Sequence, residues 1–524
     1  MKKIVLSFWA TIAIFVSFAQ EQVKQSSIYD QREAFNPQFY PYPGNDFRSA
    51  SGEPGPHYWQ NHANYKINAT IDTVNQTISG DVEITYTNNS PDNLKFLWLQ
   101  LDQNIYRKDS RGSATTTEAG GRWANQKFTE GDVIKSIAID NNGKGYTPKY
   151  NITDTRMQVW LQDALQPAGA KIKLNISFQF EVPERGTDRM GRLKTKNGWI
   201  YEIAQWFPRL CVYDDIQGWN TLPYLGAGEF YLEYGDFDYT ITAPADMVVV
   251  GSGELLNAEE CLTADQLKKY NEAKTSEKTV VIKSDKDLTD KKIKYKSATN
   301  TWKFKILNAR DVAWAASRAF IWDAAKINLP SGKNCMAASV YPIESVKKNG
   351  WQRSTEMVKG SIEHYSNQWY EFPYPVATNV AGTVGGMEYP GIVFCSSGTA
   401  GGSLWGVTDH EFGHTWFPMI VGSNERKYAW MDEGFNTFIN DLSTDAFNKG
   451  EFKSQAFFDD PSTPYMVNAV FGEKMDGLYN IPEVIQQGNL GIAAYLKPSF
   501  MLHQLRDNIL GRERFDAAFR EYIN

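Results

Sequence analysis

Residues 410–414 read His-Glu-Phe-Gly-His, and residues 430–434 read Trp-Met-Asp-Glu-Gly. Side chains four residues apart lie on the same face of a helix, so His410 and His414 can bind one metal ion with Glu411 beside it. Two imidazoles and the carboxylate of Glu433 form a ligand set that leaves one position on a zinc ion open for water. The sequence therefore predicts one catalytic Zn²⁺ per chain.

The spacing between His414 and Glu433 supports this prediction. The first helix can finish through Trp416 and Phe417, a polar turn can follow at residues 422–427, and a second helix can begin at about Trp430. Zinc with three protein ligands lowers the pKa of its water towards ~7. Glu411 can then accept a proton as that water attacks a carbonyl, which makes amide hydrolysis the expected reaction.

Composition limits the possible classes of function. The chain has 524 residues, which is more than one hydrophobic core usually contains, so two or three domains are expected. It is 42% hydrophobic and 22% charged, with a net charge of −7. This balance gives no positive field for nucleic acid or for an anionic membrane.

The N-terminus resembles a secretory signal. Lys2 and Lys3 precede an apolar run over residues 4–18, and Ala19 offers a cleavage point. We expect a signal peptide over residues 1–19, a lead segment over residues 20–57, and export to the periplasm or the extracellular space. The run is short for a membrane span of ~20 residues and no second run follows, so no stable membrane anchor is expected.

Four cysteines could form up to two disulfide bonds, in any of three pairings if all four are used. They are Cys211, Cys261, Cys335 and Cys395. Because no two of them have CxxC spacing, a structural zinc site or a redox motif is not indicated. The favoured interpretation is that they are small buried hydrophobic residues.

Residues 58–255 alternate between apolar and polar side chains in short runs separated by turn residues. Strands are expected at residues 65–71, 80–87, 172–178 and 239–243, with turns at residues 88–92 and 141–145. This pattern predicts an all-β saddle or sandwich domain over residues 58–300. Residues 257–300 are charged and of mixed propensity, and are interpreted as an insertion or a boundary.

Residues 301–524 have a different pattern. A strand is expected at residues 303–307, a helix at residues 358–369, and extended glycine-rich chain at residues 378–395. Helices are expected from Pro482 onwards. The whole is therefore predicted to be a multidomain α+β protein with a mainly helical second domain and a small sheet. The chain is expected to be cut short within a helical region at Asn524.

Residues 385–388 read Gly-Gly-Met-Glu. Glycines allow a second backbone to approach closely, and an extended edge can accept a peptide as an added strand. A carboxylate at that edge could pair with an ammonium group. By spacing alone, a surface turn is the commoner interpretation.

Taken together, these motifs resemble those of the zinc aminopeptidases of the aminopeptidase N family, which belong to the gluzincins. The resemblance lies in residues 386–388, 410–417 and 430–435. It implies a saddle-shaped β domain followed by a thermolysin-like catalytic domain, here residues 301–524. It also implies substrates that are peptides with a free N-terminus.

The resemblance assigns roles residue by residue. The implied zinc ligands are His410, His414 and Glu433, with Glu411 as general base. Glu388 would hold the substrate's α-amine, and Gly385, Gly386 and Met387 would lie along the substrate. Tyr495, about sixty residues beyond the last ligand, would donate its hydroxyl to the oxyanion.

Two positions depart from the family pattern. Tyr389 stands where the family usually has asparagine, which puts the specificity in doubt. Pro418 stands where the family usually has glycine, and is expected to end or kink the first zinc helix. Asp432, next to Glu433, is a candidate for orienting a ligand.

Two alternatives to an aminopeptidase remain open from the sequence. A thermolysin-like endopeptidase would share the metal site without needing Glu388. A noncatalytic protein that binds peptides or glycans could use the 16 Trp and 27 Tyr residues. Large hydrophobic cores also account for such aromatic content.

Overall fold

The structure is a computed structural model that describes residues 44–115, 127–290, 293, 295, 297–453, 470, 472 and 475–524. The predicted signal peptide, residues 1–19, lies outside the described residues. The described residues 44–56 belong to one unit, in which Arg48 and Pro54 make an antiparallel bridge. Residues 57–524 form the second unit, which contains all the elements below.

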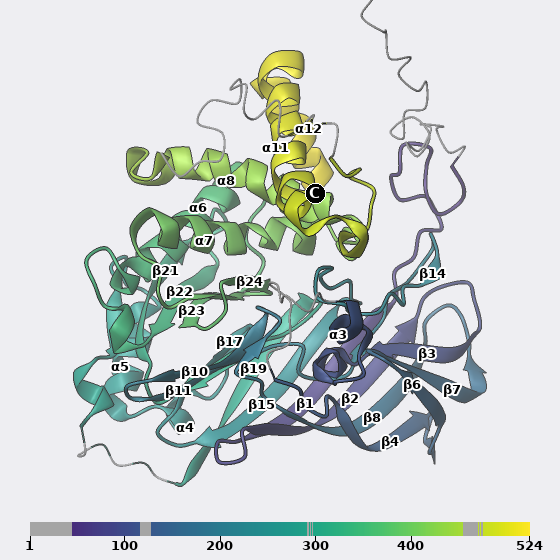
Figure 1. The fold of residues 1–524 in the computed structure, drawn as a ribbon, viewed down its shortest axis with the longest axis horizontal. Coiled ribbons are helices and arrows are strands. Elements are labelled where there is room, and N and C mark those ends of the chain that lie inside the picture. Colours follow the sequence, from purple (N-terminus) through teal and green to yellow (C-terminus); the bar gives the residue numbers. More distant parts are fainter. Residues whose placement is uncertain are drawn as a thin grey trace, which may run out of the picture. The chain divides into compact units, whose positions relative to one another are not determined.

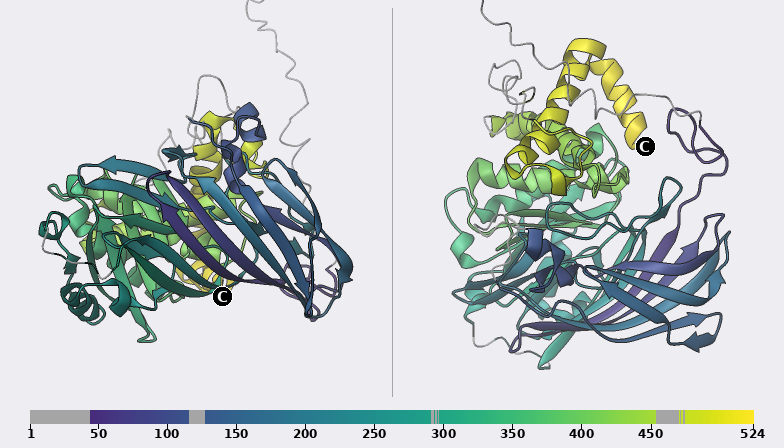
Figure 2. Two further views of the ribbon diagram at one scale, coloured as in Figure 1. Left: turned by 90° about the horizontal axis from the view of Figure 1, so that it is seen from below. Right: turned by 45° about the vertical axis from the view of Figure 1, so that its right-hand side comes forward.

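An eight-stranded sheet forms the largest part of the β-rich half (Figure 1). Its order is β17 (Glu254–Leu255), β19 (Thr299–Ala309), β15 (Gly235–Pro244), β1 (His62–Asp72), β2 (Thr77–Asn88), β8 (Ala170–Glu181), β4 (Val133–Asn141) and β5 (Lys144–Tyr146). Four central neighbours, β15, β1, β2 and β8, contain the four predicted strands. In β1 the side chains alternate between buried and more exposed positions, which places one face of the strand in the core. Figure 2 shows these long strands from below as a twisted layer.

Three smaller sheets complete the β-rich half. One consists of β12 (Arg209–Leu210), β3 (Leu94–Gln100), β7 (Arg156–Leu165) and β6 (Lys149–Thr153). Another consists of β16 (Val248–Gly251), β20 (Trp314–Ser317), β11 (Gly198–Ile203), β10 (Met190–Thr195) and β9 (Arg185–Gly186). A hairpin of β13 (Tyr213–Asp214) and β14 (Gly218–Trp219) is the third. The predicted all-β domain is thus confirmed as a set of packed sheets.

The second half is built on a six-stranded sheet. Its order is β18 (Val280–Lys283), β21 (Ile321–Asn328), β22 (Asn334–Tyr341), β23 (Val376–Gly382), β25 (Ile392–Ser396) and β24 (Gly386–Tyr389). The helices α6 (Ser354–Gln368), α7 (Gly401–Gly413) and α8 (Phe435–Ala446) lie over this sheet (Figure 1). The last helices, α11 (Lys497–Gln504) and α12 (Arg512–Ile523), both contact Phe438 of α8, α11 through His503 and α12 through Phe515 and Phe519.

The predicted division at residues 300/301 is wrong in detail. The strand expected at residues 303–307 lies within β19, which pairs with β15 in the large β sheet. Conversely, β18, from the segment interpreted as an insertion, pairs with β21 of the catalytic sheet. Apart from β18, which joins the catalytic sheet earlier in the sequence, the chain therefore passes from the β-rich half to the catalytic half near Ala319. Alternation within a strand reports burial and does not tell which sheet the strand joins.

The interpretation of the cysteines as buried residues is confirmed for Cys211, Cys335 and Cys395, whereas Cys261 is partly exposed. All four lie in the described part of the chain as free thiols.

None of the helices in the described ranges combines the length and the apolar character needed to cross a bilayer.

Candidate active site

The helix α7 carries His410, and His414 directly follows its last residue as the C-cap; α6 and α8 pack against this helix. Gly413 near its end is required by close packing, because a Cβ atom there would overlap the Asn436 amide. The helical path bends at Phe417, whose φ of −129° and ψ of 107° are not helical. The expected kink before Pro418 is thus confirmed. It turns the carbonyl of Phe417 to within 2.9 Å of His414 Nδ1.

Three predicted metal ligands converge. The Nε2 atoms of His410 and His414 are 3.2 Å apart, and they lie 3.2 Å and 3.4 Å from Glu433 Oε2. Glu433 is supplied by a helical turn, η6 (Trp430–Gly434), directly before α8. The second helix therefore begins where the sequence predicted.

The residues present fit a zinc ion. Glu433 Oε2 is buried and has no hydrogen-bond partner within the described part of the chain. A buried carboxylate oxygen without a partner is costly, and a cation shared with two imidazoles would compensate it. Two nitrogen ligands and one oxygen ligand are the donor set of a catalytic zinc site.

Neighbouring side chains orient both imidazoles. Asn440 Oδ1 lies 2.8 Å from His410 Nδ1, and Asp432 Oδ1 lies 2.7 Å from His414 Nδ1. An acceptor on Nδ1 fixes the tautomer in which Nε2 carries the lone pair that binds metal. For His414 the hydrogen-bond acceptor is the Phe417 carbonyl, with the Asp432 carboxylate close by as a charge partner, whereas Asn440 was missed.

Glu411 lies on the same turn of α7 as the histidines and is buried. Burial raises the pKa of Glu411 to about 7, although His410 and His414 favour its ionised form. A bound cation would act in the same direction as the histidines and lower that pKa. A Cβ atom at residue 386 would overlap Glu411 Oε1, so Gly386 and the carboxylate are in direct contact.

The predicted substrate segment lies at the edge of the catalytic sheet. Gly386, Met387 and Glu388 are in β24, which pairs only with β25 among the described strands, and Gly385 directly precedes it. Glu388 is buried, and its Oε1 lies 4.0 Å from His414 Nδ1. The segment is therefore an edge strand beside the metal ligands, and not a surface turn.

Tyr495 also reaches the site, from η10 (Gly491–Leu496). Its hydroxyl donates a hydrogen bond to Glu433 Oε1, and its ring stacks on His410 with centroids 5.8 Å apart. All nine residues predicted for the site are thus brought into one region.

A cavity of about 550 Å³ opens beside Glu433 and Tyr495. Its wall combines the turn after β9, the loop at residues 227–229, the segment at residues 425–433 and the segment at residues 482–496. Substrate-sized space therefore adjoins the metal ligands.

The second half of the chain matches a known family. The description "Peptidase family M1 domain" fits residues 354–524. Residues 354–524 form a peptidase family M1 domain. It is a zinc metallopeptidase domain, a hydrolase whose cofactor is a single Zn²⁺.

Solved structures share the fold of this chain over most of its length. The M1 zinc metallopeptidase from Deinococcus radiodurans is 14% identical with a TM-score of 0.52, and the match covers 90% of this chain and 87% of that one. A mutant of that protein bound to a Tyr-Ser-Ala substrate is 15% identical with a TM-score of 0.56, and the match covers 88% of this chain and 86% of that one. At this identity the likeness establishes the two-domain fold.

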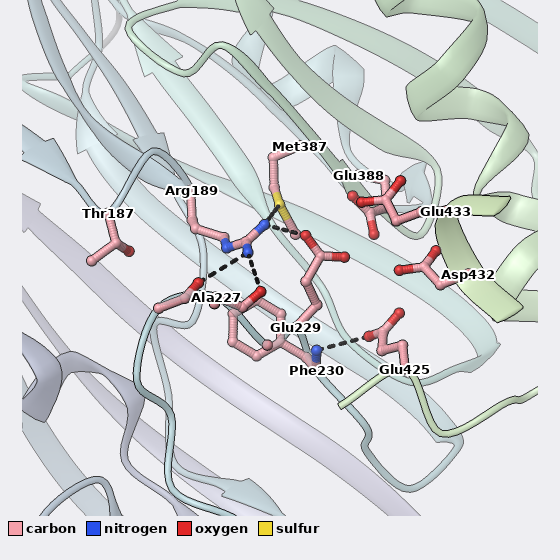
Figure 3. Close-up of polar contacts among 12 residues, drawn as sticks. Thr187, Arg189, Ala227, Glu229, Phe230, Met387, Glu388, Glu425, Asp432 and Glu433 are labelled. Carbon is pink, nitrogen blue, oxygen red and sulfur yellow. Dashed lines mark hydrogen bonds and ion pairs between the residues drawn. The ribbon is translucent and has the colours of Figure 1, made fainter. Parts of the chain in front are cut away.

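Some residues of the site were not foreseen from the sequence. Arg189 and Glu229 come from the β-rich half, and Glu425 comes from the turn before η6. Each is a single charged residue with no motif around it, so the sequence does not indicate that it lies in the site. Figure 3 shows these side chains beside Glu388 and Asp432.

Proposed function

We propose that the protein is an aminopeptidase that removes residues one at a time from the free N-terminus of peptides. The observation that carries the proposal is the position of Glu388, a buried carboxylate on an edge strand beside the metal ligands. A charged anchor at that distance leaves room for one residue before the scissile bond. The tripeptide bound to a structural neighbour supports peptides as the substrate class.

Each residue has a chemical task in this proposal. His410, His414 and Glu433 would hold the zinc ion, which supplies a Lewis acid that activates water and polarises the carbonyl. Glu411 accepts the proton of the attacking water and passes it to the leaving amine. Tyr495 donates its hydroxyl to the developing oxyanion, and so exchanges its bond to Glu433 for one to the substrate.

The β24 edge would orient the peptide. Its unpaired side can accept the substrate backbone as an added strand, which is a common way of binding extended peptides. Glu388 would meet the α-ammonium, since burial strengthens a carboxylate–ammonium pair relative to water.

Acetylation of the substrate's amine tests this proposal. An aminopeptidase cleaves a free-amine aminoacyl-arylamide and loses the N-acetylated compound, because acetylation removes the charge that Glu388 binds. A thermolysin-like endopeptidase would cleave acetylated peptides, and that result would contradict the proposal. Glu388→Gln should lower kcat/KM for the free amine, while Glu233→Gln, a buried glutamate outside the cavity wall, serves as the control.

A further inference from the structure

Two chemically different groups of residues line the cavity beside Glu433. One group is apolar and consists of Ala429, Pro482, Leu490, Ile492, Ala494 and Leu496. The other carries the charged side chains Arg189, Glu229, Glu425 and Asp432. Such a surface suits a ligand with an aliphatic stem and a polar end.

Two glutamates of the charged group have a partner for only one of their two carboxylate oxygens. Glu229 pairs through Oε1 with Arg189 Nη1 (Figure 3). Glu425 Oε1 lies 2.7 Å from Arg310 Nη2 and accepts a hydrogen bond from the Phe230 amide at 2.8 Å. In both residues the other oxygen, Oε2, is buried without a hydrogen-bond partner in the described ranges of the chain. Both glutamates line the cavity.

Four carboxylates gather beside the cavity. Oxygens from Glu229, Glu388, Glu425 and Asp432 lie within 4.8 Å of one another. Asp432 faces His414, with Oδ1 2.7 Å from Nδ1, and Glu388 would face the substrate α-ammonium. Arg189 and Arg310 each reach only one oxygen of Glu229 and Glu425, so the second oxygen of each glutamate can accept a hydrogen bond from a cationic group.

Position supports the assignment to the first substrate residue. The cavity begins at Glu433 and Tyr495, where the scissile carbonyl must lie, and its acidic side is adjacent to Glu388. A side chain that leaves the same Cα atom as the α-amine therefore points into this cavity.

We propose that Glu229 and Glu425 select a cationic side chain, arginine or lysine, on the first residue of the substrate. This inference rests on the aminopeptidase function proposed above. The apolar wall packs against the methylene stem, and the free carboxylate oxygens receive the hydrogen bonds of the charged end.

Arginyl- and citrullinyl-arylamides form the matched pair of substrates, because citrulline keeps the shape of arginine without its charge. The unmodified protein should show a kcat/KM at least ~10-fold higher for the arginyl compound, which is typical for a hydrogen bond between charged groups. Glu229→Gln and Glu425→Gln should each move this ratio towards one by lowering the arginyl rate more than the citrullinyl rate. Glu233→Gln, the same substitution outside the cavity wall, should leave the ratio intact.

The outcomes separate this inference from the function on which it rests. Cleavage of both compounds at equal rates by the unmodified protein would overturn the inference alone. An equal loss on both compounds in Glu229→Gln would also overturn it, since the residue would then act on the shared α-amine. If Glu425→Gln does not fold because Arg310 loses its partner, the rate ratio measured for Glu229→Gln decides whether the inference holds. No cleavage of any free-amine substrate would overturn both proposals.

Discussion

At residue 386, glycine is required by the catalytic group beside it and not by the backbone. A Cβ atom there would overlap Glu411 Oε1, whereas a Cβ atom at residue 385 would lie 3.3 Å from the carboxylate of Asp188. The end of a glutamate side chain can move aside at little cost in stability. For a general base, however, a small displacement is costly, because proton transfer needs hydrogen-bond distance.

We therefore expect Gly386→Ala to fold normally and to lose at least ~10-fold in kcat. Gly385→Ala is the matched control and should keep most of the activity. Steady-state kinetics with a free-amine arylamide, together with thermal denaturation, measure both effects. Full activity in Gly386→Ala would show that Glu411 does not act from its observed position.

Tyr389 shows why one departure from the family pattern could not be interpreted from sequence. Its hydroxyl donates to the Arg189 carbonyl at 2.9 Å and accepts from the Gln205 side chain at 2.7 Å. The ring is buried and does not line the cavity. Tyr389 therefore supports the turn that carries Arg189 and acts on the cavity only through that turn.

Among the elements, the pair α7 and α8 could be predicted closely. The histidine spacing predicted α7, and the tryptophan and acidic residues at 430–433 predicted the start of the second helix. The sequence could not show which residues of α8 face the metal ligands. Asn440 lies seven positions beyond Glu433, and only the packing of α8 on α7 brings it to His410.

Asn440→Ala should weaken zinc binding by ~10- to 100-fold, because His410 loses the acceptor that fixes its tautomer. Competition with a chelator measures the zinc Kd. Asn367→Ala, an exposed asparagine at the end of α6, is the control and should leave the Kd unchanged. An unaltered Kd in Asn440→Ala would show that this hydrogen bond does not support the metal site.

Across the whole second unit, the β-rich half completes the site. Its turn after β9 supplies Arg189, and Glu202 on β11 accepts hydrogen bonds from the amides of Thr383 and Val384 at 2.7 and 3.1 Å. These amides directly precede the substrate segment. Composition and the alternation of apolar and polar residues predicted two domains. A single sequence does not indicate contacts between residues almost two hundred positions apart.

Glu202 should make stability depend on pH. Burial raises the pKa of Glu202 to about 8, although the two amides favour its ionised form. In the unfolded chain its carboxyl ionises near 4.5, so between these values the folded state binds one more proton. Its contribution to stability is therefore present at low pH and is lost as pH rises from about 4.5 to about 8.

Glu202→Gln should remove this loss. Relative to the unmodified protein, the variant's free energy of unfolding should rise by up to ~1.4 kcal/mol per pH unit between pH 5 and 8. Denaturant titrations across this range measure it, with Glu181→Gln at the exposed end of β8 as the control. Parallel pH profiles for Glu202→Gln and the unmodified protein would contradict this account.

In the proposed mechanism three convergent side chains hold zinc while a separate carboxylate, Glu411, moves the proton. Zinc content and turnover of Glu411→Gln, measured on one preparation, test this division of roles. We predict one zinc per chain, as in the unmodified protein, and a loss of at least ~100-fold in kcat. Turnover retained at full zinc occupancy would contradict the claim.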